Sequence, residues 1–183
     1  SVNNVDVDAV VNVEDSSSSL SASSRGIHVG DFTGELDVTS SGVMTVDASS
    51  TGDDVYSGSS ASAFGIFIGE NLYNAIVTSN DMTITASTTA RNIDDYHTTE
   101  DGDGSDKSAN SSARGIRVTD DLDNVTINNG SMVVSAETTV EEYADYYVTT
   151  TARGIEVGDN GVDLTVNGGT LIDVSATTTV YDT

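Results

Sequence analysis

The chain has 183 residues and a formal net charge of −24, with 30 acidic side chains against 6 basic ones. That charge argues against nucleic acid and anionic membranes as partners, because both are polyanions. The absence of cysteine excludes disulfides and thiolate chemistry, and the absence of proline suits long strand ladders that need every backbone N–H.

Two short phrases recur along the chain at a nearly constant spacing. One alternates apolar and polar residues and ends in alanine, as in MTVDA at 44–48. The other contains a glycine, as in ARGI at 113–116. Both recur about every 39 residues, with one insertion of about 11 residues, and repeats of this size are typical of stacked supersecondary units.

Three short strands are expected in each repeat, in the same order each time. The glycine phrase opens the first, as in GIHV at 26–29, and a second alternating stretch follows, as in ELDVT at 35–39. Turn-forming residues come next, and the alanine phrase is the third strand. No segment has a convincing helical period, so we predict an all-β chain. The turns are expected at residues 40–42, 79–81, 128–130 and 167–169.

Strands that recur at a constant spacing can stack as parallel ladders around a coil, about 4.8 Å apart. Equivalent side chains then pack in columns, which explains why they repeat in register. An antiparallel β-sandwich is the competing fold, but it gives no reason for such repetition. We therefore predict a single parallel β-solenoid, or β-helix, over residues 1–183, with partial rungs at both ends. Its repeats are approximately 10–48, 49–86, 87–136 and 137–176.

Part of each rung is predicted to be thin. Inward positions after the alanine phrase and before the glycine phrase hold many small residues, chiefly Ala, Ser and Thr, and these let two sheets approach closely. We expect thin extensions that protrude from an apolar body and end in acidic tips. One sheet of the body should bury Ile27, Val29, Ile66, Ile68, Ile116, Val118, Ile155 and Val157.

The recurring glycine is interpreted as a structural feature. Ala113 and Ile116 are both predicted to face inward although they are three residues apart, so the alternation must shift between them. A bulge containing Gly115 would produce that shift. The four equivalent glycines should form one column, and they are Gly26, Gly65, Gly115 and Gly154.

An acidic column is the first candidate metal site. An acid stands five residues after each of the four glycines, and a solenoid would stack these like charges unless cations or salt screen them. Carboxylate oxygens suit Ca²⁺. The alternative is that the acids simply end a strand in water. The column consists of Asp31, Glu70, Asp120 and Asp159.

The second candidate for Ca²⁺ is the acidic stretch EDGDGSDKS at 100–108, in the long insertion. Its carboxylates alternate around glycine as in a calcium loop, but the complete EF-hand pattern is missing. The alternative is a flexible acidic loop. The carboxylates concerned are Asp101, Asp103 and Asp106.

The position before the glycine holds half of the chain's basic residues. It is occupied by Arg25, Phe64, Arg114 and Arg153 in the four repeats. Arginine stacked on phenylalanine, or paired with a nearby carboxylate, would form a structural ladder. Binding of acidic glycans is the functional alternative.

Alternating strands, a Ser/Ala/Gly-rich stretch and the A-x-G-I phrase at 113–116 resemble the repeats of bacterial extracellular β-helical proteins, such as autotransporter passenger regions and adhesins. The resemblance implies a right-handed parallel β-helix, an extracellular location at the cell surface, and an adhesive or scaffolding role. It supplies no catalytic residues to carry over.

We expect a structural segment of an extracellular fibre or cell-surface adhesin, stabilised by cations, rather than an enzyme. Its partners would be further repeats of the same chain or other copies stacked into filaments, and glycans or a cell surface. No stretch resembles a targeting segment or a membrane span, so we expect no membrane insertion.

Catalysis finds little support, because the chain has one lysine, Lys107, and its two histidines, His28 and His97, occupy different repeat positions. A carbohydrate-binding or carbohydrate-cleaving β-helix protein is the alternative. An ice-binding solenoid with stacked threonine rows, at 149–151 and 177–179, is a further one.

Overall fold

The computed structural model describes residues 4–16, 19–30, 36–55, 58–91, 107–141, 146–169 and 171–181. Within these ranges the chain is all β, as predicted, and contains no helix; none of them therefore offers a helical span for a membrane. The strands are β1 (Val5–Ser16), β2 (Leu20–Val29), β3 (Leu36–Val55), β4 (Ser59–Ile68), β5 (Leu72–Arg91), β6 (Lys107–Val118), β7 (Leu122–Asn129), β8 (Met132–Glu141), β9 (Tyr146–Val157), β10 (Gly161–Asn167) and β11 (Ile172–Tyr181).

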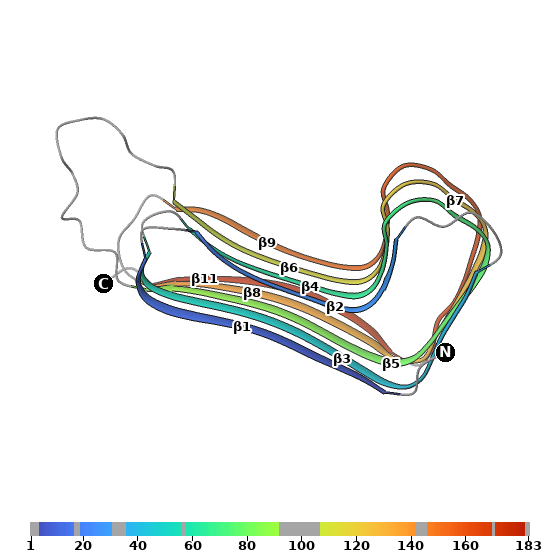
Figure 1. Ribbon diagram of the computed structural model, residues 1–183, viewed down its shortest axis with the longest axis horizontal. Helices are drawn as coiled ribbons and strands as arrows, with labels where there is room; N and C mark the ends of the chain where they lie inside the picture. The colour runs from blue at the N-terminus through green and yellow to red at the C-terminus, as the bar shows by residue number, and fades with distance from the viewer. Residues whose placement is uncertain are drawn as a thin grey trace.

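Two sheets contain all of these strands, and every pairing within them is parallel. The larger sheet has the order β1-β3-β5-β7-β10, with β8 paired to β5 and β11 paired to β8. The smaller sheet has the order β2-β4-β6-β9. Successive copies of the chain path lie side by side in both sheets (Figure 1). The parallel all-β architecture is consistent with the predicted β-solenoid.

The strand register aligns equivalent residues of the repeats. Val5 pairs with Met44, Met44 with Met82, Met82 with Met132, and Met132 with Ile172. All three methionines of the chain therefore stand in one column, and each is almost completely buried. A slip of one residue would turn this column outward, so burial fixes the register. We call these three residues the methionine column.

Two of the predicted turns are bends within longer strands. The strands β3 and β5 continue through residues 40–42 and 79–81, with a shift of register between Ser40 and Val43. At the equivalent places β7 and β8 are separate strands, as are β10 and β11. The prediction of separate short strands was therefore wrong for β3 and β5. Their backbone resumes pairing directly after the corner, where Val43 pairs with Asp81, so the strand bends without ending.

The hydrophobic core lies between the two sheets. Ile66, Ile68, Ile116 and Val118 are buried on the smaller sheet, as predicted. The equivalent residues of the outermost strands pack against the same core but are only half-buried, because each outermost strand has a neighbour on one side alone within the described residues. These half-buried residues are Ile27, Val29, Ile155 and Val157.

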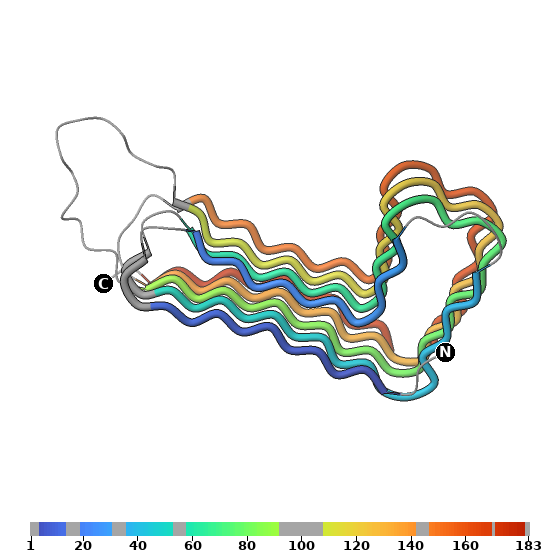
Figure 2. Tube along the Cα trace, viewed as in Figure 1, coloured from blue at the N-terminus to red at the C-terminus, as the bar shows by residue number. Residues whose placement is uncertain are grey.

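Away from this core the two sheets run close together as a long arm, as Figure 2 shows. The predicted small residues fill it, and several of their hydroxyls form bonds between the sheets. The Ser50 and Ser59 hydroxyls lie 2.6 Å apart, and Thr88 Oγ1 donates to the Asn110 carbonyl at 2.7 Å. Of the acidic stretch predicted at 100–108, residues 100–106 lie outside the described residues.

Candidate functional site

The four recurring glycines lie at equivalent places near the carboxyl ends of β2, β4, β6 and β9, because the pairs on either side of them stay in register. These four strands bend together near their carboxyl ends (Figure 1). A Cβ atom added at Gly26 would come 2.7 Å from the Gly65 carbonyl oxygen, and one at Gly65 would come 2.6 Å from that of Gly115. A Cβ at Gly115 would come 2.5 Å from the Gly154 oxygen and 2.6 Å from Met132 Sδ. Glycine is needed at these three positions because the bend presses the backbone against the next strand and the methionine column.

The bend also accounts for the shift in alternation. Ala113 and Ile116 are both buried, although they are three residues apart. Pairing runs in register on both sides of the glycine, with Phe64 opposite Arg114 and Ile66 opposite Ile116. The predicted bulge is therefore a bend shared by all four strands, since a bulge would add a residue to only one of them.

Side chains on the outer face converge across this bend. Positions immediately before the glycine and two residues after it both point outward, and the Phe64 and Phe67 rings meet with centroids 5.3 Å apart. These positions contain four of the six basic residues in the chain. We call the set the arginine patch: Arg25, Phe64, Arg114, Arg153, His28, Phe67, Arg117 and Glu156.

Guanidinium groups cover the aromatic rings of the arginine patch. The Arg25 guanidinium lies 4.9 Å from the Phe67 ring centroid and 5.6 Å from that of Phe64. Arg114 lies 5.3 Å from the Phe64 centroid on the neighbouring strand. Arg117 lies within 5.9 Å of both rings. The predicted ladder of arginine and phenylalanine is thus present, and cation–π attraction stabilises it.

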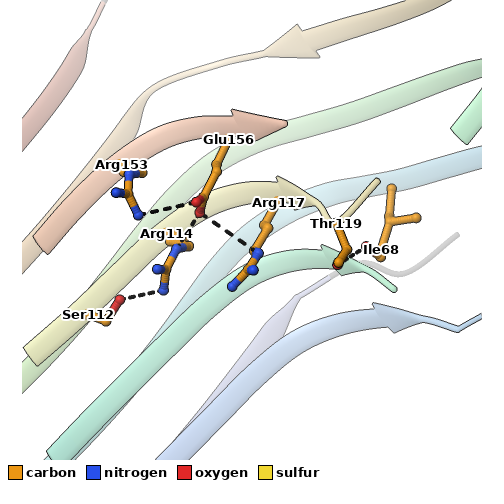
Figure 3. Close-up of polar contacts among 7 residues, drawn as sticks. All are labelled: Ile68, Ser112, Arg114, Arg117, Thr119, Arg153 and Glu156. Carbon is orange, nitrogen blue, oxygen red and sulfur yellow. Dashed lines mark hydrogen bonds and ion pairs between the residues drawn. The ribbon is translucent and has the colours of Figure 1, made fainter. Parts of the chain in front are cut away.

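A single carboxylate, from Glu156, lies among three arginines (Figure 3). Arg114 Nε donates to Glu156 Oε2, and Arg153 Nη1 donates to Oε1 at 3.2 Å. Arg117 Nε lies 3.9 Å from Oε2. Burial lowers the pKa of the Arg114 guanidinium below its usual value, Glu156 opposes that shift, and the charges of Arg117 and Arg153 add to it. The patch contains four arginines and one glutamate, so it keeps a net positive charge when Glu156 is paired.

Sequence reasoning identified only half of this patch. It named the column before the glycine but not the second outward column of His28, Phe67, Arg117 and Glu156. The signal was available, because the shift that turns Ala113 and Ile116 inward must turn the positions after each of them outward.

The predicted acidic column is only partly described. Glu70, Asp120 and Asp159 follow β4, β6 and β9, and Asp159 N donates to the Asp120 carbonyl at 3.2 Å. In the described ranges no group of three or more His, Cys, Asp or Glu residues could hold a metal ion. The remaining predicted ligands, Asp31, Asp101, Asp103 and Asp106, lie outside the described residues, as does His97.

A polar ladder that the sequence did not reveal runs beside the acidic column. Asp121 N donates to Asn71 Oδ1 at 3.0 Å, and Asn160 N and Nδ2 donate to Asp121 Oδ1 at 3.1 and 3.0 Å. Asp121 therefore accepts hydrogen bonds from the next repeat, and its carboxylate has a structural use that needs no cation.

The threonine rows considered for ice binding are incomplete. One outward column of the larger sheet contains threonine in four consecutive strands, but the column two residues before it contains Ser49, Ser87, Glu137 and Thr177. On the smaller sheet, Thr149 is aligned with Asn110 and Ser60. The continuous threonine column is Thr51, Thr89, Thr139 and Thr179.

No family model matches the chain, and no curated protein or solved structure matches it. The chemistry of the candidate site therefore follows from its own residues. Guanidinium groups donate several hydrogen bonds in one plane and suit carboxylate, sulfate or phosphate oxygens. The arginine patch, with four such groups and one carboxylate, is the candidate binding site.

Proposed function

We propose that this chain is a structural segment of an extracellular fibre or cell-surface adhesin, built as a right-handed parallel β-solenoid with a repeat of about 39 residues. Contacts between equivalent residues support the repeat. The bonds from Val43 to Asn4 and from Asn167 to Asn128 each span 39 residues, and the bond from Ser79 to Asn129 spans 50 because it crosses the insertion.

Uncovered core positions on the last strands carry this proposal. Val134 is fully buried, whereas its partner Val174 on β11 is 41% exposed. Ile127 is likewise fully buried, whereas its partner Val166 on β10 is 42% exposed. Another rung of the same kind would cover these side chains and continue the ladder hydrogen bonds, as neighbouring repeats do in solenoids. The cover would come from further repeats or from another copy of the chain.

Rod length tests the proposal directly. Chains carrying increasing numbers of extra copies of residues 137–176, inserted after Ala176, would be imaged by electron microscopy. We expect rods of constant width that lengthen by about 4.8 Å for each added repeat, and unfolding midpoints that rise with repeat number. Particles that grow in all dimensions would contradict a solenoid, and midpoints independent of repeat number would contradict covering of the β10 and β11 core positions.

Carbohydrate binding is a second candidate function, and the arginine patch favours it. Its guanidinium groups lie on the outer face of the smaller sheet, where a ligand can reach them without opening the core. Such binding is compatible with a structural role, because the patch uses outward positions and the rod uses inward ones.

A further inference from the structure

Positive charge gathers at one place in the described part of this acidic chain. Arg25, Arg114, Arg117 and Arg153 all belong to the arginine patch. Outside the patch, Arg91 lies in the arm and pairs with Glu141 at 3.1 Å. A chain with a net charge of −24 gains nothing in solubility from clustering its few basic side chains. The clustering therefore indicates a role for these side chains at the patch itself.

The arginines of the patch are held in fixed orientations before any ligand arrives. Arg25 and Arg114 each lie against the Phe64 ring, and Phe64 itself is only 6% exposed. Stacking on a buried ring orients a planar guanidinium and reduces the side-chain entropy lost on binding. The N–H groups at the guanidinium edges are the parts that stacking leaves available.

Two arginines still have donor capacity that the described residues do not satisfy. Arg25 contacts the two phenylalanine rings and forms no ion pair within the described ranges. The Nε atom of Arg117 is buried and lacks a hydrogen-bond acceptor there, since Glu156 is 3.9 Å away. A buried donor without an acceptor is costly. Arg25 is exposed, so its N–H groups are the donors that a ligand oxygen can reach.

Glu156 demonstrates what kind of group the patch accepts. Its carboxylate receives hydrogen bonds from Arg114 and Arg153, which lie on neighbouring strands. The equivalent positions on the other strands hold His28, Phe67 and Arg117, so the carboxylate occurs only at the end of the column. The rest of the patch has the same donors without a carboxylate of its own.

The surface on one side of the patch is neutral and rich in hydroxyls. Two outward columns lead along the strands of the smaller sheet to the arginines, and none of their side chains is charged or fully buried. Hydroxyl and amide groups both donate and accept hydrogen bonds, as sugar hydroxyls do. We call these columns the hydroxyl strip: Ser21, Ser60, Asn110 and Thr149, with Ser23, Ser62, Ser112 and Thr151.

The surface on the other side is acidic. Glu70, Asp120 and Asp159 follow the carboxyl ends of the same strands, shortly beyond the patch. A polyanion extending across the patch would meet these carboxylates and be repelled. A ligand with an isolated negative group and a neutral body would avoid them by lying along the hydroxyl strip.

We propose that the arginine patch binds the carboxylate or sulfate group of an otherwise neutral glycan, whose sugar hydroxyls contact the hydroxyl strip. An acidic peptide fits less well. Side chains on one face of an extended peptide repeat at about 6.6 Å, whereas the strands that carry the arginines are about 4.8 Å apart. The site adds a recognition function to the proposed structural one and does not depend on whether rungs continue beyond β11.

Calorimetric titration of the folded chain at physiological salt tests the site. The probes are sialyllactose, which carries one carboxylate on a neutral disaccharide, sulfated lactose, lactose, free acetate, free sulfate and an acidic peptide. We expect one or both charged sugars to bind at least tenfold more tightly than lactose and than either free anion. Equal binding of lactose, equal binding of a free anion, or tighter binding of the peptide would each overturn the proposal.

Three variants locate the binding. Arg25→Gln, which breaks no described ion pair, should weaken binding of the charged sugar at least tenfold, whereas Arg91→Gln removes the same charge outside the patch and should change it less than twofold. Glu156→Gln should strengthen binding severalfold, because it frees Arg114 and Arg153 from their internal carboxylate. Equal effects of Arg25→Gln and Arg91→Gln, or weaker binding by a folded Glu156→Gln variant, would overturn the assignment.

Discussion

The sulfur of Met132 occupies the space next to Gly115 that a side chain would need. A Cβ atom at Gly115 would lie 2.6 Å from that sulfur and 2.5 Å from the Gly154 carbonyl oxygen. The methionine can move aside, but the carbonyl belongs to a paired strand and cannot. This contact makes Gly115 sensitive even to substitution by alanine.

We expect Gly115→Ala to lower the free energy of unfolding by about 1–3 kcal/mol, the usual range for overpacking a core. Gly154→Ala is the matched control, since an added Cβ there would meet its nearest neighbour, Val174, at 3.4 Å, an ordinary contact. Urea unfolding of the two variants measures the difference. Equal losses would show that the contact at Gly115 relaxes at no cost.

Ile116→Ala should lower the free energy of unfolding by roughly 2–5 kcal/mol, because it leaves a cavity beneath a side chain that is 1% exposed. Ile155→Ala, at the equivalent half-buried position on β9, should cost clearly less. The comparison is again made by urea unfolding. A loss at Ile116 no larger than that at Ile155 would contradict its central place in the core.

Asn124 has a left-handed backbone conformation, with φ of 52°, and its Nδ2 donates to Asn74 Oδ1 at 2.7 Å. Asn124→Ala should destabilise the fold by about 1–2 kcal/mol, because alanine is strained in that conformation. Asn124→Gly should cost less, since glycine tolerates it and only the side-chain bond is lost. Thermal unfolding shows which of the two variants is more stable. A glycine variant less stable than the alanine variant would contradict the role of φ.

Hydrogen bonds from the side chain and backbone N–H of Ser131 lower the pKa of Asp81 below its usual value, with a smaller opposing effect of desolvation. Because the pKa is lower in the folded state, the stability that this contact provides is present above the usual carboxyl range. It is lost as the pH falls through the folded-state pKa.

Replacing Ser131 by alanine should therefore raise the pKa of Asp81 towards its usual value and reduce this part of the acid dependence. An NMR titration of the Asp81 carboxyl carbon measures the pKa. Ser135→Ala, on the strand β8 that follows Ser131, is the control and should leave it unchanged. An unaltered Asp81 titration in the Ser131 variant would assign the shift to another group.

Calcium stabilisation through the acidic column stays a prediction. We expect millimolar Ca²⁺ to raise the unfolding midpoint above that in NaCl of equal ionic strength, and a site at a hundredfold excess over its Kd would add about 2.7 kcal/mol. Asp120→Asn should reduce the effect. Identical midpoints in the two salts would leave general screening alone, and an undiminished effect in Asp120→Asn would move the site away from the column.

The sequence was sufficient for features that depend on repetition. Equal spacing of the glycine and alanine phrases indicated parallel strands in register. The odd separation of Ala113 and Ile116 placed the change of alternation at Gly115, although it predicted a bulge and not a shared bend. Each of these inferences used residue identity and spacing alone, which a stacked fold preserves from one rung to the next.

Other features depend on backbone geometry that spacing does not encode. The left-handed conformation of Asn124 is one example, and the continuation of β3 through residues 40–42 is another, because a bend and a break use the same turn-forming residues. The convergence of Arg114 and Arg117 required knowing that the bend is concave on its outer face. Only then do two outward columns become one patch.

The methionine column contains all the sulfur atoms of the chain, and its side chains are buried between the two sheets. Peroxide reaches a thioether only where water does, so sulfoxide formation at Met44, Met82 and Met132 should be slow in the folded protein and should report transient separation of the sheets. The chain has no cysteine to compete for the oxidant. Mass spectrometry would give the oxidation rate of each methionine, and so the opening rate at β3, β5 and β8 separately. The rate of methionine oxidation would therefore measure how often the core between the two sheets opens to solvent.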